Sequence, residues 1–441
     1  MSLLRRLFSG DSSNISNILL NIGVRGCTAG GTFILGWMLA RVLSIDEFGQ
    51  YALCFTALIV TTILARLGID IAIHRFGGAA WFNDKKQVFS SYCNLALKST
   101  LGLSSLLTLV AIPVTILASQ MGYVQLKVAA WMIVAIIPYT LIYIYSSILK
   151  SAGMPKLGAA FEVGGVSAVA AVAIAIMYWL DVTITAAIGA MTLSFSAIAV
   201  LAVVMLVAKW MGIRISGGPK LTKLEKKAFF TSSTELGVTA ITNTLAIHSG
   251  SFFLALHWTD ADIAGFSAAL RLVSLTIVFR NVVIFIVNPK LAGMFAAGDM
   301  SGFQKLARKS ALQIGVLCSF ALLPMVIAPS LMMSIYGPEF QQHAPLLATM
   351  AVGQIIATLT CIAPGALAMA GREKQLRKVT LGIGLTCLLL NYVLTYNLSA
   401  FGAACGAAVY FLSLGISLML TTHNQLGVWA IPRIPLGVKK A

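Results

Sequence analysis

Of the 441 residues of this chain, 59% are hydrophobic and only 10% are charged, whereas a soluble domain carries about 25% charged residues. The composition therefore excludes a soluble globular protein and indicates a polytopic membrane protein. The period-two alternation of apolar and polar residues that marks an outer-membrane barrel is absent. A net charge of +17 would suit a nucleic-acid partner, but the positions of the basic residues, described below, argue against one.

Apolar runs bounded by polar loops predict about twelve transmembrane helices. The segment before them lacks the layout of a signal peptide and is expected to lie along the membrane surface. The predicted fold is an all-α polytopic membrane protein. Its helices are expected near 19–42, 50–75, 86–118, 124–150, 156–180, 184–209, 227–257, 263–289, 303–333, 343–369, 376–397 and 400–422.

The basic residues of the loops predict the orientation of these spans. With the N-terminus inside, 24 of the 31 Lys and Arg residues fall in cytoplasmic segments, and none falls in an outer loop. Acidic residues such as Asp46, Asp260 and Glu339 fall outside. Both termini are therefore predicted to be cytoplasmic. The positive charge mainly sets orientation, which makes a nucleic-acid partner unnecessary.

The chain also repeats itself. Three landmarks recur at offsets of 215 to 218 residues: Gly49 with Gly265, Asp84 with Asp299, and Gly153 with Gly371. Each lies at the same place in a series of six helices, so we expect two parallel six-helix bundles related by a pseudo-twofold axis, with a central site between them. The predicted parts are a juxtamembrane segment 1–18, an N-lobe 19–209, a cytoplasmic linker 210–226, a C-lobe 227–422 and a cytoplasmic tail 423–441.

Charged residues at predicted membrane depth are the candidate site residues. A charge at the centre of a span costs about 2.5–3.5 kcal/mol on insertion scales, so most of these residues should face protein or water. The excess of basic over acidic residues favours an anionic ligand. The basic residues are Arg25, Arg66, Lys98, Arg271 and Arg280, and the acidic ones are Asp70, Glu162 and Glu235.

Each basic residue of the predicted N-lobe also has a structural alternative. Arg25 belongs to a polar stripe on the first span, but it is near enough to the inner end to snorkel. Arg66 lies one turn before Asp70, so a structural ion pair and a substrate contact remain equally open. Lys98 is expected deep in the third span, where it binds substrate or pairs with an acid to hold the lobe together.

In the predicted C-lobe, Arg271 is the strongest candidate for ligand binding. Helical spacing places it on one face of the eighth span with Ser274, Asn281 and Asn288, and this face carries no acid. Arg280 is nine residues further on and points to the opposite face, where inter-helix pairing or snorkelling is slightly favoured.

Three acids and one histidine are candidates for gating or ion coupling. Glu235, on the seventh span, takes up a proton or coupling cation or, as we favour, neutralises a neighbouring Arg. Glu162 is close to the start of the fifth span and interacts favourably with the helix dipole there. His248 is a hydrogen-bonded helix residue or a proton shuttle, and Asp70 sets a gate or pairs with Arg66.

No enzyme signature is present in the sequence. It contains no P-loop, no marked nucleophile and no cluster with metal-ligand spacing. The seven cysteines lie in apolar segments without a C-x-x-C pair. We therefore expect neither catalysis nor a metal or cofactor.

Several short motifs occur in a characteristic order. They are Leu39-Ala-Arg-Val-Leu-Ser-Ile-Asp-Glu-Phe-Gly-Gln-Tyr-Ala52, Leu67-Gly-Ile-Asp70, Tyr336-Gly-Pro-Glu-Phe340 and Ala370-Gly-Arg-Glu-Lys374. Their order and spacing resemble those of bacterial polysaccharide flippases of the O-antigen type. These flippases belong to the multidrug/oligosaccharidyl-lipid/polysaccharide exporter superfamily. The resemblance runs from about residue 15 to residue 422.

This resemblance implies a protein of the bacterial inner membrane with two six-helix bundles around a central cavity. It implies translocation of undecaprenyl-pyrophosphate-linked oligosaccharide from the cytoplasmic to the periplasmic leaflet by alternating access. The polyprenyl tail would stay in membrane lipid, Arg and Lys of the cavity would bind the pyrophosphate, and a proton or sodium ion would be the coupling ion. Other polysaccharide-assembly proteins are possible partners.

Two alternatives stay open. An ion-coupled multidrug exporter of the same superfamily should have a cavity rich in acids, whereas basic residues are in excess here. A membrane glycosyltransferase or ligase usually has large outer loops with catalytic residues, and the outer loops predicted here are short.

Overall fold

The computed structural model of the chain describes residues 30–215 and 217–429, and all regular structure in these ranges is helical. Helices cover every predicted span within the described residues. Seven of the helical segments are, each by itself, long and apolar enough to cross a membrane. The chain is therefore an all-α polytopic membrane protein.

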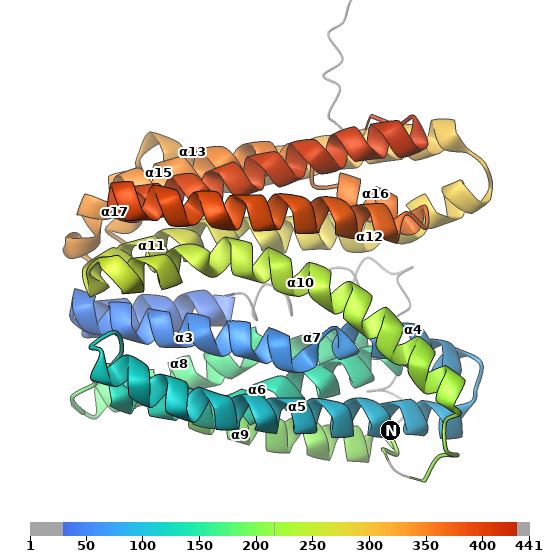
Figure 1. Cartoon of the computed structure of the whole chain (residues 1–441), viewed down its shortest axis with the longest axis horizontal. Helices are drawn as coiled ribbons and strands as arrows, with labels where there is room; N and C mark the ends of the chain where they lie inside the picture. Colours follow the sequence, from blue (N-terminus) through green and yellow to red (C-terminus); the bar gives the residue numbers. More distant parts are fainter. Residues whose placement is uncertain (1–29, 216, 430–441) are drawn as a thin grey trace, which may run out of the picture. The chain divides into compact units, whose positions relative to one another are not determined.

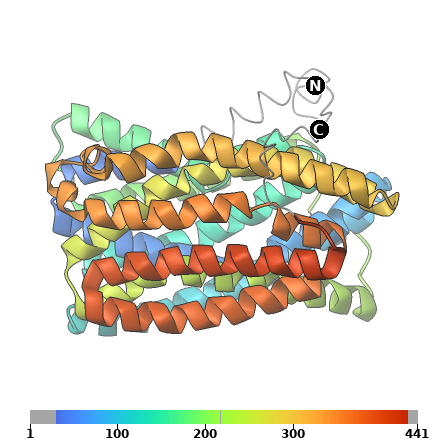
Figure 2. The ribbon, with the colours of Figure 1, turned by 90° about the horizontal axis from the view of Figure 1, so that it is seen from above.

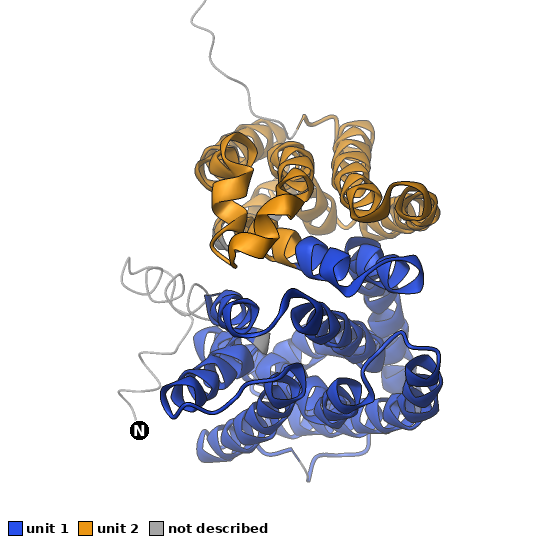
Figure 3. Ribbon diagram, turned by 90° about the vertical axis from the view of Figure 1, so that its left-hand side faces the viewer, with its two compact units in different colours: residues 1–267 blue, residues 268–441 orange. Residues whose placement is uncertain are grey.

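Contacts divide the chain into two compact units, residues 1–267 and 268–441 (Figure 3). Helix α11 (Asp260–Ser274) crosses this boundary. The described helices that lie wholly in the first unit are 30–42, α3 (Ile45–Arg66), α4 (Ile69–Phe82), α5 (Lys86–Gln120), α6 (Leu126–Ser151), α7 (Pro155–Ala160), α8 (Val163–Trp179), α9 (Ala186–Trp210) and α10 (Lys223–His257).

In the second unit, the longest helix, α17, bends sharply at Ser399, where the backbone leaves helical geometry. Its two arms run back along each other (Figure 2), and they correspond to the last two predicted spans. The helices of this unit are α12 (Thr276–Ala296), α13 (Met300–Ile327), α14 (Pro329–Met333), the 3-10 helix η1 (Pro338–His343), α15 (Ala344–Leu359), α16 (Ala363–Met369) and α17 (Glu373–Leu426).

Helices of the first unit pack side by side along their length. α6 contacts α3, α5 and α9, and Figure 1 shows these four helices lying with their axes roughly parallel. Helix α10 packs against α3 and α4, so by its contacts it belongs to the first unit although the predicted C-lobe begins with it. The duplication of six helices is inferred from the sequence repeat alone, and it stays a prediction.

Local capping explains where several helices begin. The side chains of Ser44 and Thr185 accept hydrogen bonds from the first turns of α3 and α9. Thr222 and Glu225 form a reciprocal capping box at the start of α10. These hydrogen bonds to the carboxylate hold the pKa of Glu225 below its ordinary value. Polar residues at the ends of apolar runs thus satisfy the free N–H groups of each helix start.

The second predicted span, 50–75, is broken into α3 and α4. Leu67 and Gly68 both have positive φ angles, +42° and +75°, which is uncommon for a leucine. The hydroxyl of Ser233, on α10, donates to the Leu67 carbonyl oxygen at 2.7 Å. A Cβ at Gly68 would lie 2.2 Å from the Ser233 carbonyl oxygen. The break is therefore held by the close approach of α10.

An aromatic cluster joins α4, α5 and α10 on the same side of this break. The rings of Phe76, Tyr92 and Phe229 lie with their centroids 5.7 to 5.8 Å apart. Phe229 is completely buried. Aromatic pairs at such distances stabilise a core beyond the area that they bury. The cluster thus fixes the first part of α10 to the first unit.

Candidate functional site

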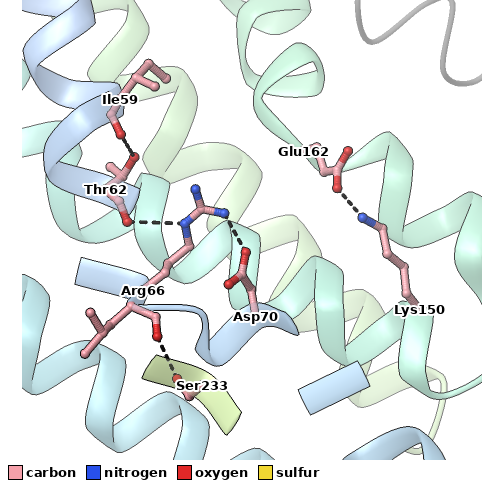
Figure 4. Close-up of polar contacts among 8 residues, drawn as sticks. Ile59, Thr62, Arg66, Asp70, Lys150, Glu162 and Ser233 are labelled. Carbon is pink, nitrogen blue, oxygen red and sulfur yellow. Dashed lines mark hydrogen bonds and ion pairs between the residues drawn. The ribbon is translucent and has the colours of Figure 1, made fainter. Parts of the chain in front are cut away.

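An ion pair bridges the break between α3 and α4. Arg66 is the last residue of α3 and Asp70 is the second residue of α4, and their Nη1 and Oδ2 atoms are 2.8 Å apart (Figure 4). The guanidinium Nε also donates to the Thr62 carbonyl oxygen at 3.2 Å. Arg66 is buried, with 7% of its surface exposed. The contact predicted from the one-turn spacing is therefore confirmed.

Tyr143 of α6 completes the environment of Arg66. The guanidinium carbon lies 3.6 Å from the centre of the Tyr143 ring. A cation over an aromatic face is stabilised by the ring quadrupole, and more strongly where water is excluded. Arg66 is thus held from three sides: by a carbonyl of its own helix, by a carboxylate across the break and by a ring of a neighbouring helix.

A second ion pair joins Lys150, at the end of α6, to Glu162, at the start of α8 (Figure 4). The chain turns between them at Gly153, which has a φ of +79°. The short helix α7 packs tightly on α6, because a Cβ at Gly158 would lie 2.6 Å from the Ser146 carbonyl oxygen. This packing brings the two ends together. Glu162 therefore has a cationic partner in addition to its place at a helix N-terminus.

His74 lies close to both pairs. The charges of Lys150, Asp70 and Glu162 act on its ring, and its Nδ1 is 3.2 Å from the Ser151 hydroxyl oxygen. We call Arg66, Asp70, Lys150 and Glu162 the charged cluster. Its formal charges sum to zero. The two ion pairs can therefore hold α3 to α4 and α6 to α8. Protonation of a carboxylate, or binding of a ligand to Arg66 or Lys150, would break a pair. The charged cluster is not by itself an anion site.

Two other predicted basic residues of the N-lobe stand apart from the charged cluster. Arg25 lies outside the described residues. Lys98 is on α5 with its side chain exposed. No carboxylate pairs with Lys98 in the described part of the chain, so the structure does not support the alternative in which an acid partner holds it in the lobe.

The arginines of the second unit occupy two different helices. Arg271 is in the last turn of α11 and Arg280 is in α12, and both are half-buried. The chain leaves helical hydrogen bonding between them, near Leu275. Arg271 and Ser274 lie three residues apart on α11, whereas Asn281 and Asn288 belong to α12. The face predicted for these four residues therefore spans two helices and stays a prediction.

The positive charge of Arg271 acts on Tyr336, the first residue of the Tyr336-Gly-Pro-Glu-Phe340 motif. Burial raises the pKa of the Tyr336 hydroxyl, and the positive charge of Arg271 partly offsets this rise. Tyr336 is completely buried just before η1. A motif identified by resemblance and a candidate basic residue are thus electrostatically coupled within the second unit.

Glu235 and His248 both lie on α10 and are half-buried. They belong to the helix that packs against α3 and α4, and they are not members of the charged cluster. Their predicted roles in neutralisation or ion coupling stay predictions.

The sequence reasoning missed Lys150 and Tyr143 as members of the site. Lys150 had been assigned to the cytoplasmic loop charges. Its partner Glu162 is 12 residues further along the chain, beyond the turn at Gly153 and the whole of α7, so no simple spacing predicts the pair. Tyr143 likewise has no signal in the sequence, because its contact with Arg66 depends on how α6 packs against α3.

Solved structures share this fold at low sequence identity. A multidrug resistance MATE family transporter of the MOP superfamily, in an inward-facing conformation, has a TM-score of 0.70 and 12% identity over 93% of this chain and 98% of that chain. The MATE multidrug transporter DinF-BH in complex with R6G has a TM-score of 0.68 and 13% identity over 96% of this chain and 95% of that chain.

An outward-facing conformation of a multidrug resistance MATE family transporter has a TM-score of 0.65 and 15% identity over 96% of this chain and 97% of that chain. No curated protein matches the sequence. A family model described as polysaccharide biosynthesis protein matches residues 15–292. Together with the fold, this match confirms the resemblance of the sequence motifs to a polysaccharide family, whereas the O-antigen type stays a prediction. The model covers more than half of the chain, and the chain therefore belongs to the polysaccharide biosynthesis protein family.

Proposed function

We propose that this protein is a flippase of the bacterial inner membrane that moves undecaprenyl-pyrophosphate-linked oligosaccharide units to the periplasmic leaflet by alternating access. Family membership supports a role in polysaccharide biosynthesis, and the fold is that of membrane transporters. The protein would be a transporter rather than an enzyme. Its head-group site would be cationic, and the polyprenyl tail would remain in lipid.

The observation that carries the proposal is the distribution of charge between the two units. In the first unit, Arg66 and Lys150 are each neutralised by a carboxylate. From residue 268 onward, the acids are Asp299, Glu339 and Glu373, and all three lie outside the predicted spans. The predicted spans from residue 268 onward therefore contain Arg271 and Arg280 and no acidic residue. Such a surplus of positive charge suits a pyrophosphate, which guanidinium groups bind through paired hydrogen bonds.

The roles that follow are also proposals. Arg271 and Arg280 would bind the anionic head group, with Arg25 as a further candidate, whereas the exposed Lys98 would contribute least. Arg66 would act from within the charged cluster, where an anionic ligand competes with Asp70 for its guanidinium. Glu162, Glu235 and His248, together with Asp70, would be the groups that respond to a coupling proton or sodium ion.

Deletion of the gene followed by analysis of lipid-linked glycans tests the function directly. We expect lipid-linked oligosaccharide to accumulate on the cytoplasmic leaflet, and re-expression of the intact protein to restore its transfer. Normal amounts in the periplasmic leaflet of the deletion strain would overturn the proposal.

The orientation is tested by labelling from outside. Cysteine variants of Ser44 and Glu339 should react with an impermeant thiol reagent, whereas a cysteine at position 216 should not. The opposite pattern would place both termini outside.

An ion-coupled multidrug exporter is the second candidate, since solved transporters with this fold are multidrug transporters. It predicts that the deletion strain becomes sensitive to cationic drugs while its lipid-linked glycans stay normal. The surplus of basic residues argues for the flippase, because a cavity for cationic drugs needs acids.

A further inference from the structure

Three predicted outer turns of the first unit meet at the side chain of Gln50, near the start of α3. Its amide nitrogen donates to the Asp260 carboxylate at 2.7 Å and to the Tyr123 carbonyl oxygen at 3.5 Å. Its amide oxygen accepts from the Gln125 backbone N–H at 2.9 Å. Gln50 is 4% exposed. One buried amide thus connects the turn before α3, the turn between α5 and α6, and the start of α11.

The backbones at this junction are in direct contact. A Cβ added at Gly49 would lie 2.0 Å from the Asp260 carbonyl oxygen and 3.1 Å from its Cα. No side chain fits between α3 and the start of α11 at this point. Burial raises the pKa of the Asp260 carboxyl, the hydrogen bond from Gln50 opposes this rise, and the neighbouring charge of Asp46 adds to it. The carboxylate is half-buried where the helices touch.

Each of the two helix starts is stabilised within its own turn. Ser44 caps α3 by accepting from the Glu47 N–H at 3.3 Å. Thr259 and Asp262 exchange hydrogen bonds in the same way at the start of α11. Because these bonds are local, the two turns can separate without unfolding. Gln50 and Asp260 are 210 residues apart, and their bond links the first sequence repeat to the second within one compact unit.

Helix α10 directly precedes α11, and its first half, away from this junction, packs closely against the break between α3 and α4. The Ser233 hydroxyl donates to the Leu67 carbonyl oxygen, and a Cβ at Gly237 would lie 2.4 Å from the Leu67 carbonyl carbon. The aromatic contact of Phe229 lies in the same region. The outer contact instead joins two helix starts that are each capped on their own, which suits it to opening.

We propose that the contact of Gly49 and Gln50 with Asp260 is an outer latch, which closes the transport path on the outer side and opens once in each cycle. The inference rests on the proposed alternating-access function and adds the residues that would close one side. Cys54, one turn after Gln50 and 4% exposed, lies within reach of the Asp260 charge and serves as a native reporter of the latch.

Crosslinking tests whether the latch must open. In a Cys54→Ala background, Gln50→Cys and Asp260→Cys should join in membranes under oxidant or a short bis-thiosulfonate reagent, and joining should stop glycan transfer until a reductant is added. The single-cysteine variants are controls for oxidation alone. Normal transfer by the crosslinked protein, or failure to crosslink in properly folded protein, would overturn the proposal.

Labelling of Cys54 by an impermeant maleimide tests the latch in the absence of substrate. The labelling that remains in the Cys54→Ala variant is subtracted as background. Gln50→Glu places a carboxylate against Asp260 and should raise the labelling rate by about tenfold or more, since facing like charges cost several kcal/mol. Asp260→Asn keeps an acceptor for Gln50 and should label almost as the intact protein does. The double variant Gln50→Glu with Asp260→Asn should return to slow labelling.

Gly49→Ala should also increase labelling, because its Cβ has no space at Asp260. The matched control is Gly78→Ala, on α4, where a Cβ meets nothing within 4 Å. Equal labelling of Gln50→Glu and the intact protein would overturn the latch. If labelling behaves as expected while deletion leaves lipid-linked glycans unchanged, the latch stands and the proposed substrate falls.

Discussion

The two units differ in the charges of their spans. In the first unit, Arg66 and Lys150 each contact a carboxylate and the charged cluster sums to zero, whereas Lys98 is exposed and pairs with no carboxylate among the described residues. The spans of the second unit contain Arg271 and Arg280 but no acid. The same residue types therefore form ion pairs in the first unit and give the predicted spans of the second unit a positive charge. A charge count over the whole chain cannot distinguish the two uses.

The largest effect on transport is expected in the second unit. Arg271→Ala and Arg280→Ala should each lower glycan transfer by about tenfold or more while the protein reaches the membrane in normal amounts, because a desolvated charge contact to the head group is lost. Arg271→Lys should keep partial activity, since a point charge replaces the attraction but not the two-pronged geometry. Transfer is measured as periplasmic lipid-linked glycan.

The control for these variants is Lys127→Ala, whose side chain is exposed near an outer helix end. It should leave transfer unchanged. Full transfer by Arg271→Ala at normal expression would remove Arg271 from the site and weaken the contrast between the units.

Breaking the Arg66–Asp70 pair should lower the folded yield more than it lowers the transport activity of the folded protein. Asp70→Asn leaves Arg66 buried without its carboxylate and should reduce the folded yield in size-exclusion chromatography. The cost should fall below the roughly 3–5 kcal/mol of a fully buried pair, since the Asp70 side chain is 20% exposed.

Adding Arg66→Gln to Asp70→Asn should restore the yield, because both charges are then absent. A double variant that folds but fails to transfer glycan would show that Arg66 also binds substrate. Normal yield and transfer in both single variants would contradict both roles.

The second pair of the charged cluster should matter less for stability. Glu162→Gln should cost about 1 kcal/mol or less, because the Glu162 side chain is 38% exposed and water screens its attraction to Lys150. The measurement is the midpoint of thermal unfolding in detergent, compared with Asp70→Asn. A larger loss than that of Asp70→Asn would reverse the ranking of the two pairs.

The smallest effect is expected at Lys98. Its side chain is exposed on α5, so Lys98→Gln should change transfer by less than about twofold and leave the yield unaltered. A strong loss of transfer would show that cationic binding extends into the first unit.

Local features of this protein could be predicted from its sequence. The helices follow from apolar runs, because a backbone in lipid must satisfy its hydrogen bonds within the segment. The one-turn spacing of Arg66 and Asp70 predicts their contact, and the pair forms although the helix breaks between them at Leu67. Short motifs in a characteristic order also indicated a polysaccharide family, which the family model confirms over residues 15–292.

Only the tertiary structure decided where these helices break and which distant residues meet. The breaks at Leu67 and Leu275 interrupt runs that read as continuous spans, and the first break depends on the seating of Ser233. Contact between Gln50 and Asp260 likewise has no local signal, because it depends on two turns 210 residues apart. Spacing encodes neighbours on one helix, whereas contacts between helices depend on packing over the whole unit.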